Sequence, residues 1–393
     1  MKAMIKSQHL FSGAFGIERE TLRIDKNGNL SKTPHPFDCE HITRDFCENQ
    51  IEIITPVCES IDKAVSSLEE LDRYTREILE QNDETLWLYS NPPYFESEDD
   101  IIIADFTGKE KHKRIYREVL EKKYGKRLML FSGIHFNFSF SDAFLKELWN
   151  ENSIMPFSDF KDDLYLKLYI QLMKHSFLLV MLTAASPYYS PSFDGDTSAP
   201  DEIRLSEYSS IRNSERGYWN RFIPILEHDS IQSFVKSIER YIKDGKLYSA
   251  SELYLPVRLK PKGSNSLENL CQNGVDHIEL RMFDLDPSYP LGIDKTDLKF
   301  AHIMMIYLLS KTDREFTAQQ QIKALSDHKN AALICPAPEL INRGMAVLDE
   351  MEKYFSAYPD AVDIIQYEHE KLNTIRRYGA ERFCKSCRCI STA

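Results

Sequence analysis

The sequence has no apolar run long enough to cross a membrane. The hydrophobic stretch over residues 177–182 is far shorter than the roughly 20 residues that a spanning helix requires. The first residues, MKAMIKSQHLFSG, also lack the apolar core and the small-residue cleavage pattern of a secretory signal. We therefore expect no membrane contact and predict a cytoplasmic protein.

An excess of positive charge is missing as well. The chain has 61 Asp and Glu residues against 49 Lys and Arg residues, which gives a formal net charge of -12. Binding to nucleic acid requires a basic face that neutralises phosphates. The charge balance argues against a nucleic acid partner, although it leaves room for a local basic pocket around a small phosphorylated ligand.

Cysteine is present but scattered. Of the eight cysteines, only Cys384, Cys387 and Cys389 cluster, in the stretch CKSCRC. Without a secretion signal, we expect thiols rather than disulfides. The CxxC spacing has no second pair of ligands nearby, which favours a thiol-bearing tail over a zinc site.

Several familiar site motifs are absent. The sequence contains no G-x-x-x-x-G-K-[ST] and no G-x-G-x-x-G after a strand, which excludes a P-loop and a Rossmann fingerprint. The H-E-x-x-H motif of zinc proteases and the G-x-S-x-G motif of α/β-hydrolases are also missing. If a nucleotide binds, metal ions and side chains must hold its phosphates.

The patterns that are present indicate an α+β protein. A length of 393 residues allows roughly two to three domains. Apolar residues at helical spacing predict helices over residues 61–81, 159–185 and 296–310. Strand patterns stop after these helices and only helical patterns follow. We therefore predict an α+β body over residues 1–312 and a helical C-terminal extension over residues 313–393.

Alternation at a period of two gives the predicted strands a polar face. In GIERETLRI, Glu18 and Glu20 point the same way, about 7 Å apart along the strand. Three further stretches, GIHFNFSFS, LYLPVRLKP and HIELRMFDL, carry large apolar side chains on one face. Their other faces hold His135, Asn137 and Ser139, then Tyr254, Arg258 and Lys260, and finally His277, Glu279 and Arg281.

For any single strand, the solvated side of an antiparallel sheet is the simpler explanation. The combined set is less ordinary, because carboxylates suit divalent cations such as Mg²⁺ or Mn²⁺. Arginine and lysine suit phosphate oxygens. Glu52, between two isoleucines, and Asp45, at the end of a turn-like stretch, are either solvent-facing or further ligands. The pattern suggests chemistry of ATP and metal ions on an open sheet.

Six stretches resemble the ordered motif blocks of one family. They are GIERETLRIDKNGNLSKTPHP, TRDFCENQIEIITP, RIYREVLEKKYG, SGIHFNFSF, ELYLPVRLKPK and GVDHIELRMFDLDPSYPLGID, within residues 13–310. Together they resemble the bacterial glutamate–cysteine ligases, or γ-glutamylcysteine synthetases, of the proteobacterial type. The resemblance implies a glutamine-synthetase-like fold, in which a curved, mainly antiparallel sheet flanked by helices forms a funnel-like active site.

The resemblance also implies a reaction. ATP, L-glutamate and L-cysteine would give γ-glutamylcysteine, ADP and phosphate through a γ-glutamyl phosphate, in the first step of glutathione biosynthesis. ATP would be a co-substrate, and Mg²⁺ or Mn²⁺ would be the cofactor. We expect small-molecule substrates and a monomer, and the sequence leaves an oligomer open.

Site roles follow from the resemblance where the motifs match. The metal ligands would be Glu18, Glu20, Asp45, Glu52, His135 and Glu279. Arg281 would be catalytic together with Glu279, contacting the transferring phosphoryl group and the glutamate γ-carboxyl. The cysteine pocket would contain Phe46, Tyr116, Arg204 and Tyr254, and the nucleotide contacts would be Arg258 and Lys260.

One stretch departs from the family pattern. The family shows a serine–leucine–arginine–leucine–serine segment followed by a glycine–tyrosine pair. In DEIRLSEYSS, Arg204 and Ser206 match this segment, but the tyrosine is displaced to Tyr208. The predicted cysteine pocket therefore depends on a partial match.

Other interpretations stay open from the sequence. His135 could be a structural histidine, Glu279 and Arg281 a plain ion pair on one strand face, and Tyr116 and Tyr254 packing residues. At the level of the whole protein, one alternative is a related carboxylate–amine ligase that joins glutamate to a different amine. The other is a non-catalytic relative that binds glutamate or nucleotide.

Overall fold

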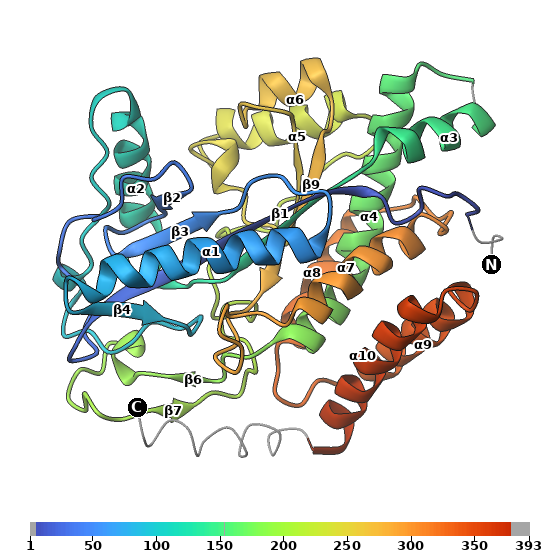
Figure 1. Cartoon of the computed structure of the whole chain (residues 1–393). Helices are drawn as coiled ribbons and strands as arrows, with labels where there is room; N and C mark the ends of the chain where they lie inside the picture. Colours follow the sequence, from blue (N-terminus) through green and yellow to red (C-terminus); the bar gives the residue numbers. More distant parts are fainter. Residues whose placement is uncertain (1–4, 153, 379–393) are drawn as a thin grey trace.

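The computed structural model describes residues 5–152 and 154–378, and its core is one large sheet (Figure 1). Seven strands form this sheet in the order β2-β3-β1-β5-β9-β8, with β4 also paired to β1. They are β1 (Gly13–Asp25), β2 (Ile42–Arg44), β3 (Gln50–Ile54), β4 (Glu84–Trp87), β5 (Ile134–Phe140), β8 (Val257–Lys260) and β9 (His277–Phe283). All of their pairings are antiparallel, which confirms the predicted sheet type.

Ten α-helices occur in the described part of the chain, together with a small second sheet. The helices are α1 (Ile61–Glu80), α2 (Lys111–Tyr124), α3 (Asp142–Asn152), α4 (Phe157–Thr183), α5 (Ile231–Lys243), α6 (Leu267–Asn273), α7 (Lys295–Leu308), α8 (Ala318–Ala331), α9 (Pro338–Tyr354) and α10 (Pro359–Tyr378). The second sheet pairs β6 (Tyr188–Tyr189) with β7 (Arg204–Leu205). The three helices predicted from apolar spacing correspond to α1, α4 and α7.

One predicted strand is shorter than expected. The stretch LYLPVRLKP enters the sheet only at Val257, and the residues before it follow the short 3-10 helix η5 (Ala250–Glu252). Pro256 precedes the strand and Pro261 follows it. Proline has no N–H to donate to a strand neighbour, so the two prolines delimit the strand. Tyr254 therefore lies on a loop rather than on the sheet.

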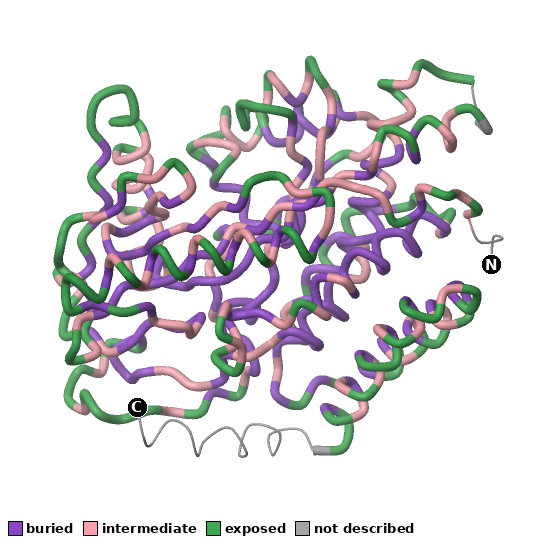
Figure 2. The backbone as a smooth tube through the Cα atoms, in the orientation of Figure 1, coloured by how far each residue is buried: buried purple, intermediate pink, exposed green. Residues whose placement is uncertain are grey.

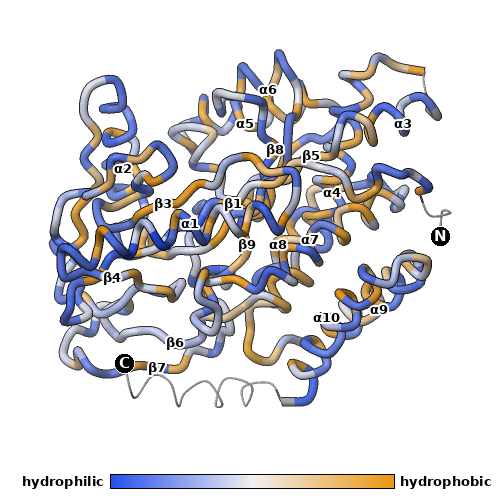
Figure 3. The backbone as a smooth tube through the Cα atoms, viewed as in Figure 1, coloured by the Kyte–Doolittle hydropathy of each residue, from blue (hydrophilic) through white to orange (hydrophobic). Residues whose placement is uncertain are grey.

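Helices cover the apolar face of the sheet. The side chains of Phe136 and Phe138 on β5 are buried and join the same core as Tyr165 of α4 and Phe300 of α7. The helix α1 packs on β1, β3 and β4, while α4 packs on β8 and β9. Burial is concentrated in the central strands and in α4 and α7 (Figure 2). Hydrophobic residues follow the same elements, whereas α1 alternates between hydrophilic and hydrophobic positions (Figure 3).

The C-terminal helices pack onto this core. The helix α8 lies against α4, and α10 lies against α4, α7 and α9. Buried residues such as Leu325, Leu348 and Leu372 show that α8, α9 and α10 each bury apolar residues. The predicted helical structure after residue 312 is thus confirmed for residues 313–378, and a domain boundary there stays a prediction. The cluster of Cys384, Cys387 and Cys389 lies outside the described residues.

None of the helices in residues 5–152 and 154–378 combines the length and the hydropathy needed to cross a bilayer. The longest of them, α4, has 27 residues. Its charged residues, such as Lys161 and Asp162, interrupt the apolar sequence.

Two arginines are buried on the helix-covered side of β1, which the alternation pattern of the strand did not predict. Arg19 and Arg23 alternate with the glutamates of this strand and are both fully buried. The Arg19 guanidinium lies 2.5 Å from Asp72 on α1. The Arg23 guanidinium lies 2.6 Å from Glu84 on β4. These ion pairs join β1 to its neighbours from the side opposite Glu18 and Glu20.

Loss of the first ion pair should destabilise the fold. Asp72→Ala leaves Arg19 buried without its carboxylate, and we expect the free energy of unfolding to fall by about 3–5 kcal/mol. Urea unfolding followed by circular dichroism measures the change. Glu59→Ala removes the exposed ion pair with Lys63 and should leave the midpoint unchanged. Equal midpoints for the two variants would show that other partners hold Arg19.

Candidate active site

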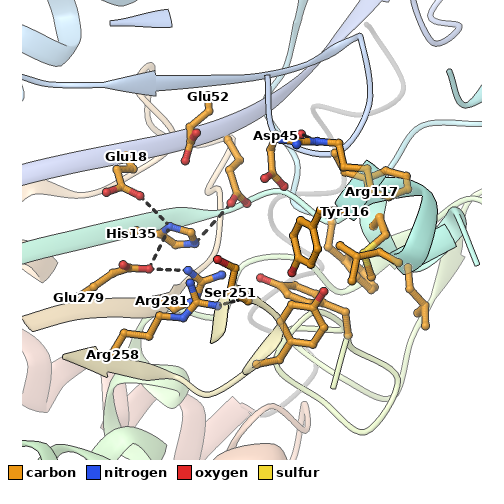
Figure 4. Close-up of a pocket in the computed structure, with 18 of the residues that line it drawn as sticks. Glu18, Asp45, Glu52, Tyr116, Arg117, His135, Ser251, Arg258, Glu279 and Arg281 are labelled. Carbon is orange, nitrogen blue, oxygen red and sulfur yellow. Dashed lines mark hydrogen bonds and ion pairs between the residues drawn. The ribbon is translucent and has the colours of Figure 1, made fainter. Parts of the chain in front are cut away.

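A pocket lies on the polar face of the sheet, opposite the helix layer, and is closed by α2 and by loops (Figure 4). Most of the predicted site residues line it, namely Glu18, Glu20, Asp45, Phe46, Glu52, Tyr116, His135, Tyr254, Arg258, Lys260, Glu279 and Arg281. The remaining predicted residue, Arg204, does not. Segments far apart in the sequence thus meet at one place.

Strand register brings the acidic side chains together. Glu20 of β1 lies directly opposite Glu52 of β3, and Glu18 lies opposite His135 of β5. Side chains opposite one another on neighbouring antiparallel strands project from the same face at close range. Asp45 directly follows β2, which is the next strand beyond β3. The alternation seen in the sequence therefore produces one continuous acidic face.

His135 lies among these carboxylates and is almost fully buried. Its Nδ1 is 3.2 Å from Glu18 Oε2, and its Nε2 is 3.5 Å from Glu20 Oε1. The same Nε2 has no hydrogen-bond partner among the described residues. Water cannot easily supply one either, because His135 is only 2% exposed. One ligand atom each from Glu18, Glu52 and His135 lie within 4.8 Å of one another. Carboxylate oxygens with an imidazole nitrogen form a donor set that fits a divalent cation.

Burial and mutual repulsion disturb the charge of this acidic face. Burial raises the pKa of Glu52 well above its ordinary value, and the neighbouring carboxylates of Glu18 and Asp45 raise it further. Burial also raises the pKa of Glu20. For Glu18, burial acts in the same direction, but the hydrogen bond with His135 leaves its pKa below the ordinary value. Without a cation, burial and repulsion therefore shift the pKa values of Glu20 and Glu52 in the direction that favours their protonated forms.

Positive side chains surround the other end of the site. Glu279 is fully buried, its Oε2 lies 2.6 Å from Lys260 Nζ, and Arg281 Nη1 donates a hydrogen bond to its Oε1. Burial alone would raise the pKa of Glu279, but Lys260 and Arg281 hold it well below its usual range. Arg258 lies opposite Glu279 in the sheet register and donates to the backbone oxygen of Ser251 at 2.7 Å. Glu279 is therefore shared between the acidic face and the cations.

Aromatic rings close the remaining side of the pocket. Phe46, Tyr116, Tyr218 and Tyr254 all line it. The rings of Tyr218 and Tyr254 meet edge to face with centroids 5.1 Å apart. Burial raises the pKa of Tyr116 to about 12, so its hydroxyl stays protonated at neutral pH. This wall can accept an apolar or sulfur-containing group beside the polar face.

The placement of Arg204 differs from the prediction. Arg204 lies on β7, away from the pocket, where it pairs with Glu202 at 2.7 Å and Asp196 at 2.8 Å. Tyr208 does not line the pocket either. Tyr218 does, and it follows Gly217 in the stretch IRNSERGY. This glycine–tyrosine pair, ten residues further along the chain than Tyr208, was the signal that could have identified Tyr218 as a pocket residue.

Arg117 is a second pocket residue that sequence reasoning missed. It follows Tyr116 on α2, and its Nε donates a hydrogen bond to the backbone oxygen of Asp45. Its Nη2 donates to the backbone oxygen of Arg44 at 3.2 Å. These contacts fix the turn that carries Asp45 and Phe46 against α2. The sequence of α2 contains many other Lys and Arg residues, such as the exposed Lys111 and Lys122, so it did not single out Arg117.

Comparison with known proteins establishes the family. The family model described as glutamate-cysteine ligase matches residues 1–331. The chain belongs to the glutamate-cysteine ligase family. This member of the family is 41% identical over 337 residues to the glutathione biosynthesis bifunctional protein GshAB of Listeria monocytogenes, across 82% of this chain and 44% of that protein. The chain thus spans about half the length of the GshAB relatives it matches.

Relatives whose length is closer to that of this chain are named glutamate–cysteine ligase. The glutamate–cysteine ligase of Clostridium acetobutylicum is 27% identical over 454 residues, across 97% of this chain and 93% of that protein. The crystal structure of the glutamate–cysteine ligase of Francisella tularensis in complex with AMP has a TM-score of 0.84 and 25% identity. It is matched over 96% of this chain and 85% of that one. This family member therefore shares its fold with a nucleotide-bound ligase.

The repulsion on the acidic face predicts a pH-dependent effect of Glu52→Gln. A raised pKa means that folding favours protonated Glu52, and this stability is lost as the pH rises through the folded pKa. Glutamine cannot ionise, so in EDTA the variant should gain stability over the parent chain as the pH rises from weakly acidic to weakly alkaline. Thermal unfolding measures the difference. The exposed Glu59→Gln is the control, and a difference that is constant with pH would contradict the repulsion.

Proposed function

We propose that this chain catalyses the ATP-dependent joining of the γ-carboxyl of L-glutamate to the amine of L-cysteine. The products would be γ-glutamylcysteine, ADP and phosphate, as in the first step of glutathione biosynthesis. The observation that carries the proposal is the single pocket in which the acidic face of β1, β3 and β5 meets Lys260 and Arg281. Membership of the family and the AMP complex of the Francisella relative support it.

We assign the acidic face to divalent cations, Mg²⁺ or Mn²⁺. Their ligands would come from Glu18, Glu20, Asp45, Glu52, His135 and Glu279. His135 Nε2, which makes no hydrogen bond to the described residues, and the crowded carboxylates support this assignment, because both gain a ligand partner when a cation binds. When bound, such cations neutralise the charge of nucleotide phosphates and of a transferring phosphoryl group.

The cationic end of the pocket suits the phosphoryl-transfer step. A carboxylate is a poor electrophile, so the glutamate γ-carboxylate must first become an acyl phosphate. Phosphoryl transfer needs positioning and charge neutralisation more than covalent help from the protein. We assign Arg281 to the γ-carboxylate and the transferring phosphoryl oxygens, and Lys260 and Arg258 to the nucleotide phosphates. Glu279 would keep Arg281 and Lys260 in place between these groups.

The aromatic wall suits the amine substrate. We assign Phe46, Tyr116 and Tyr254 to the side chain of cysteine, and we add Tyr218, whose ring contacts Tyr254. A thiol is a small, polarisable group that packs well against aromatic edges. After the ammonium group of cysteine loses a proton, the free amine bound there would attack the acyl phosphate carbon, forming the C–N bond as the C–O bond to phosphate breaks. The placement of Arg204 outside the pocket does not support a role for it in this step.

The reaction can be tested through ADP release. With Mg²⁺, ATP, glutamate and a panel of amines, we expect turnover that depends on cysteine and that EDTA abolishes. Mass spectrometry should identify γ-glutamylcysteine as the product. Turnover with another amine but not with cysteine would replace the proposal with the related ligase. Absence of ATP turnover under all of these conditions would favour a non-catalytic binding protein.

The role of Arg281 can be tested separately. Because its guanidinium would stabilise charge that develops during phosphoryl transfer, Arg281→Ala should lower turnover by about 100- to 1,000-fold. Circular dichroism and the unfolding midpoint check that the variant folds. Arg314→Ala, which removes an exposed ion pair with Asp163, is the matched control and should retain parental turnover. Near-parental turnover in Arg281→Ala would rule out the assigned role.

A further inference from the structure

Glu252 is a fully buried carboxylate behind the aromatic wall, outside the acidic face of the sheet. Its Oε1 accepts hydrogen bonds from Lys123 Nζ and from the Tyr124 hydroxyl, the latter at 2.6 Å. Its Oε2 accepts a hydrogen bond from the backbone N–H of Tyr248, also at 2.6 Å. Both oxygens of one side chain therefore tie the end of α2 to the loop that precedes β8.

Asn220 extends this network to a third segment. Its Nδ2 donates to the backbone oxygen of Glu252 at 2.7 Å, and its Oδ1 accepts from the backbone N–H of Tyr254 at 2.9 Å. Asn220 lies two residues after Tyr218. The segments around Tyr116, Tyr218 and Tyr254, which are distant in sequence, thus meet at Glu252 and its neighbours.

The pocket tyrosines pack on residues that this network holds. The ring of Tyr116 stacks on that of Tyr248 with centroids 5.9 Å apart. The ring of Tyr254 meets Tyr124 edge to face at 5.7 Å and Tyr218 at 5.1 Å. A shift of either Tyr124 or Tyr248 would therefore move the rings that enclose the pocket.

We propose that Glu252, together with Lys123, is a positioning residue that sets the spacing of Tyr116, Tyr218 and Tyr254 around the amine substrate. The identity of that substrate rests on the proposed function, whereas the positioning itself rests on the contacts above. Glu252 lines no part of the pocket, so it acts through the tyrosines. A buried carboxylate that loses a partner is strongly disfavoured, so the network is sensitive to a change of one atom.

Glu252→Gln keeps the size of the side chain but offers an acceptor at only one end. At least one hydrogen bond, from α2 or from the backbone N–H of Tyr248, must then be lost. This change should weaken the binding of cysteine and leave the chemical step unaffected. We therefore expect the KM for cysteine to rise about tenfold, while kcat and the KM for ATP change by less than about twofold. Lys123→Met should act in the same way, and Lys123→Arg, which keeps the cation, should stay near the parent chain.

The chain offers a control with the same types of hydrogen-bond partner, although Glu350 is less buried than Glu252. At the contact of α7 with α9, Glu350 accepts hydrogen bonds from Lys311 and from the Tyr307 hydroxyl, the same residue types that surround Glu252. None of these residues lines the pocket. Glu350→Gln should therefore leave kcat and the KM values for cysteine, ATP and glutamate unchanged. An equal effect of Glu350→Gln would mean that the kinetics report only general stability.

Hydrogen–deuterium exchange tests the positioning without catalysis. In Glu252→Gln, backbone amides of residues 218–220 and 248–254 should exchange faster than in the parent chain, while those of β1 and β5 should not change. Unchanged exchange in both segments, or a KM for cysteine that stays at the parental value, would overturn the proposal. If the parent chain shows no cysteine-dependent turnover, the proposed function fails, and the exchange data still decide the positioning role.

Discussion

Crowding of like charges on one face of the sheet is the constraint on which the rest of the structure depends. Glu18, Glu20 and Glu52 lie together because the antiparallel register places them there. Asp45 joins them from the end of β2, the strand next to β3. Their repulsion works against the folded state unless protons or cations compensate it. A rigid sheet is needed to keep such groups close, and the helix layer on the opposite face supplies that rigidity.

The two faces of β1 show how one strand can present crowded carboxylates and still be held firmly in the sheet. One face presents glutamates to the pocket, and the other buries Arg19 and Arg23 against Asp72 and Glu84. Each of these ion pairs connects β1 to another element, so the strand is held from behind while its front stays open. These buried ion pairs stabilise the strand against the repulsion among the carboxylates, and they take no part in the chemistry.

Glu279 connects the two halves of the site. It lies 3.7 Å from His135 on one side and 2.6 Å from Lys260 on the other. A ligand that carries both cations and phosphate groups can therefore place its cations at the acidic end of the pocket and its phosphates at the basic end. This polarity suits a nucleotide with its metal ions, and the aromatic wall offers a separate surface for the amine substrate that we propose. The same separation makes Glu252 important, because it orders the wall without entering the pocket.

The sequence by itself determined most of the central strands, their polar faces and many of the residue types of the site. Alternation at a period of two is a local property, so Glu18, Glu20, His135 and Glu279 could be found before any fold was known. Only the tertiary structure decided which residues from helices and loops join them. Arg117 and Tyr218 reach the pocket through long-range packing, and Arg204 stays outside it despite a partial motif match. Sequence spacing fixes directions within one element, whereas contact between elements depends on how the whole chain packs.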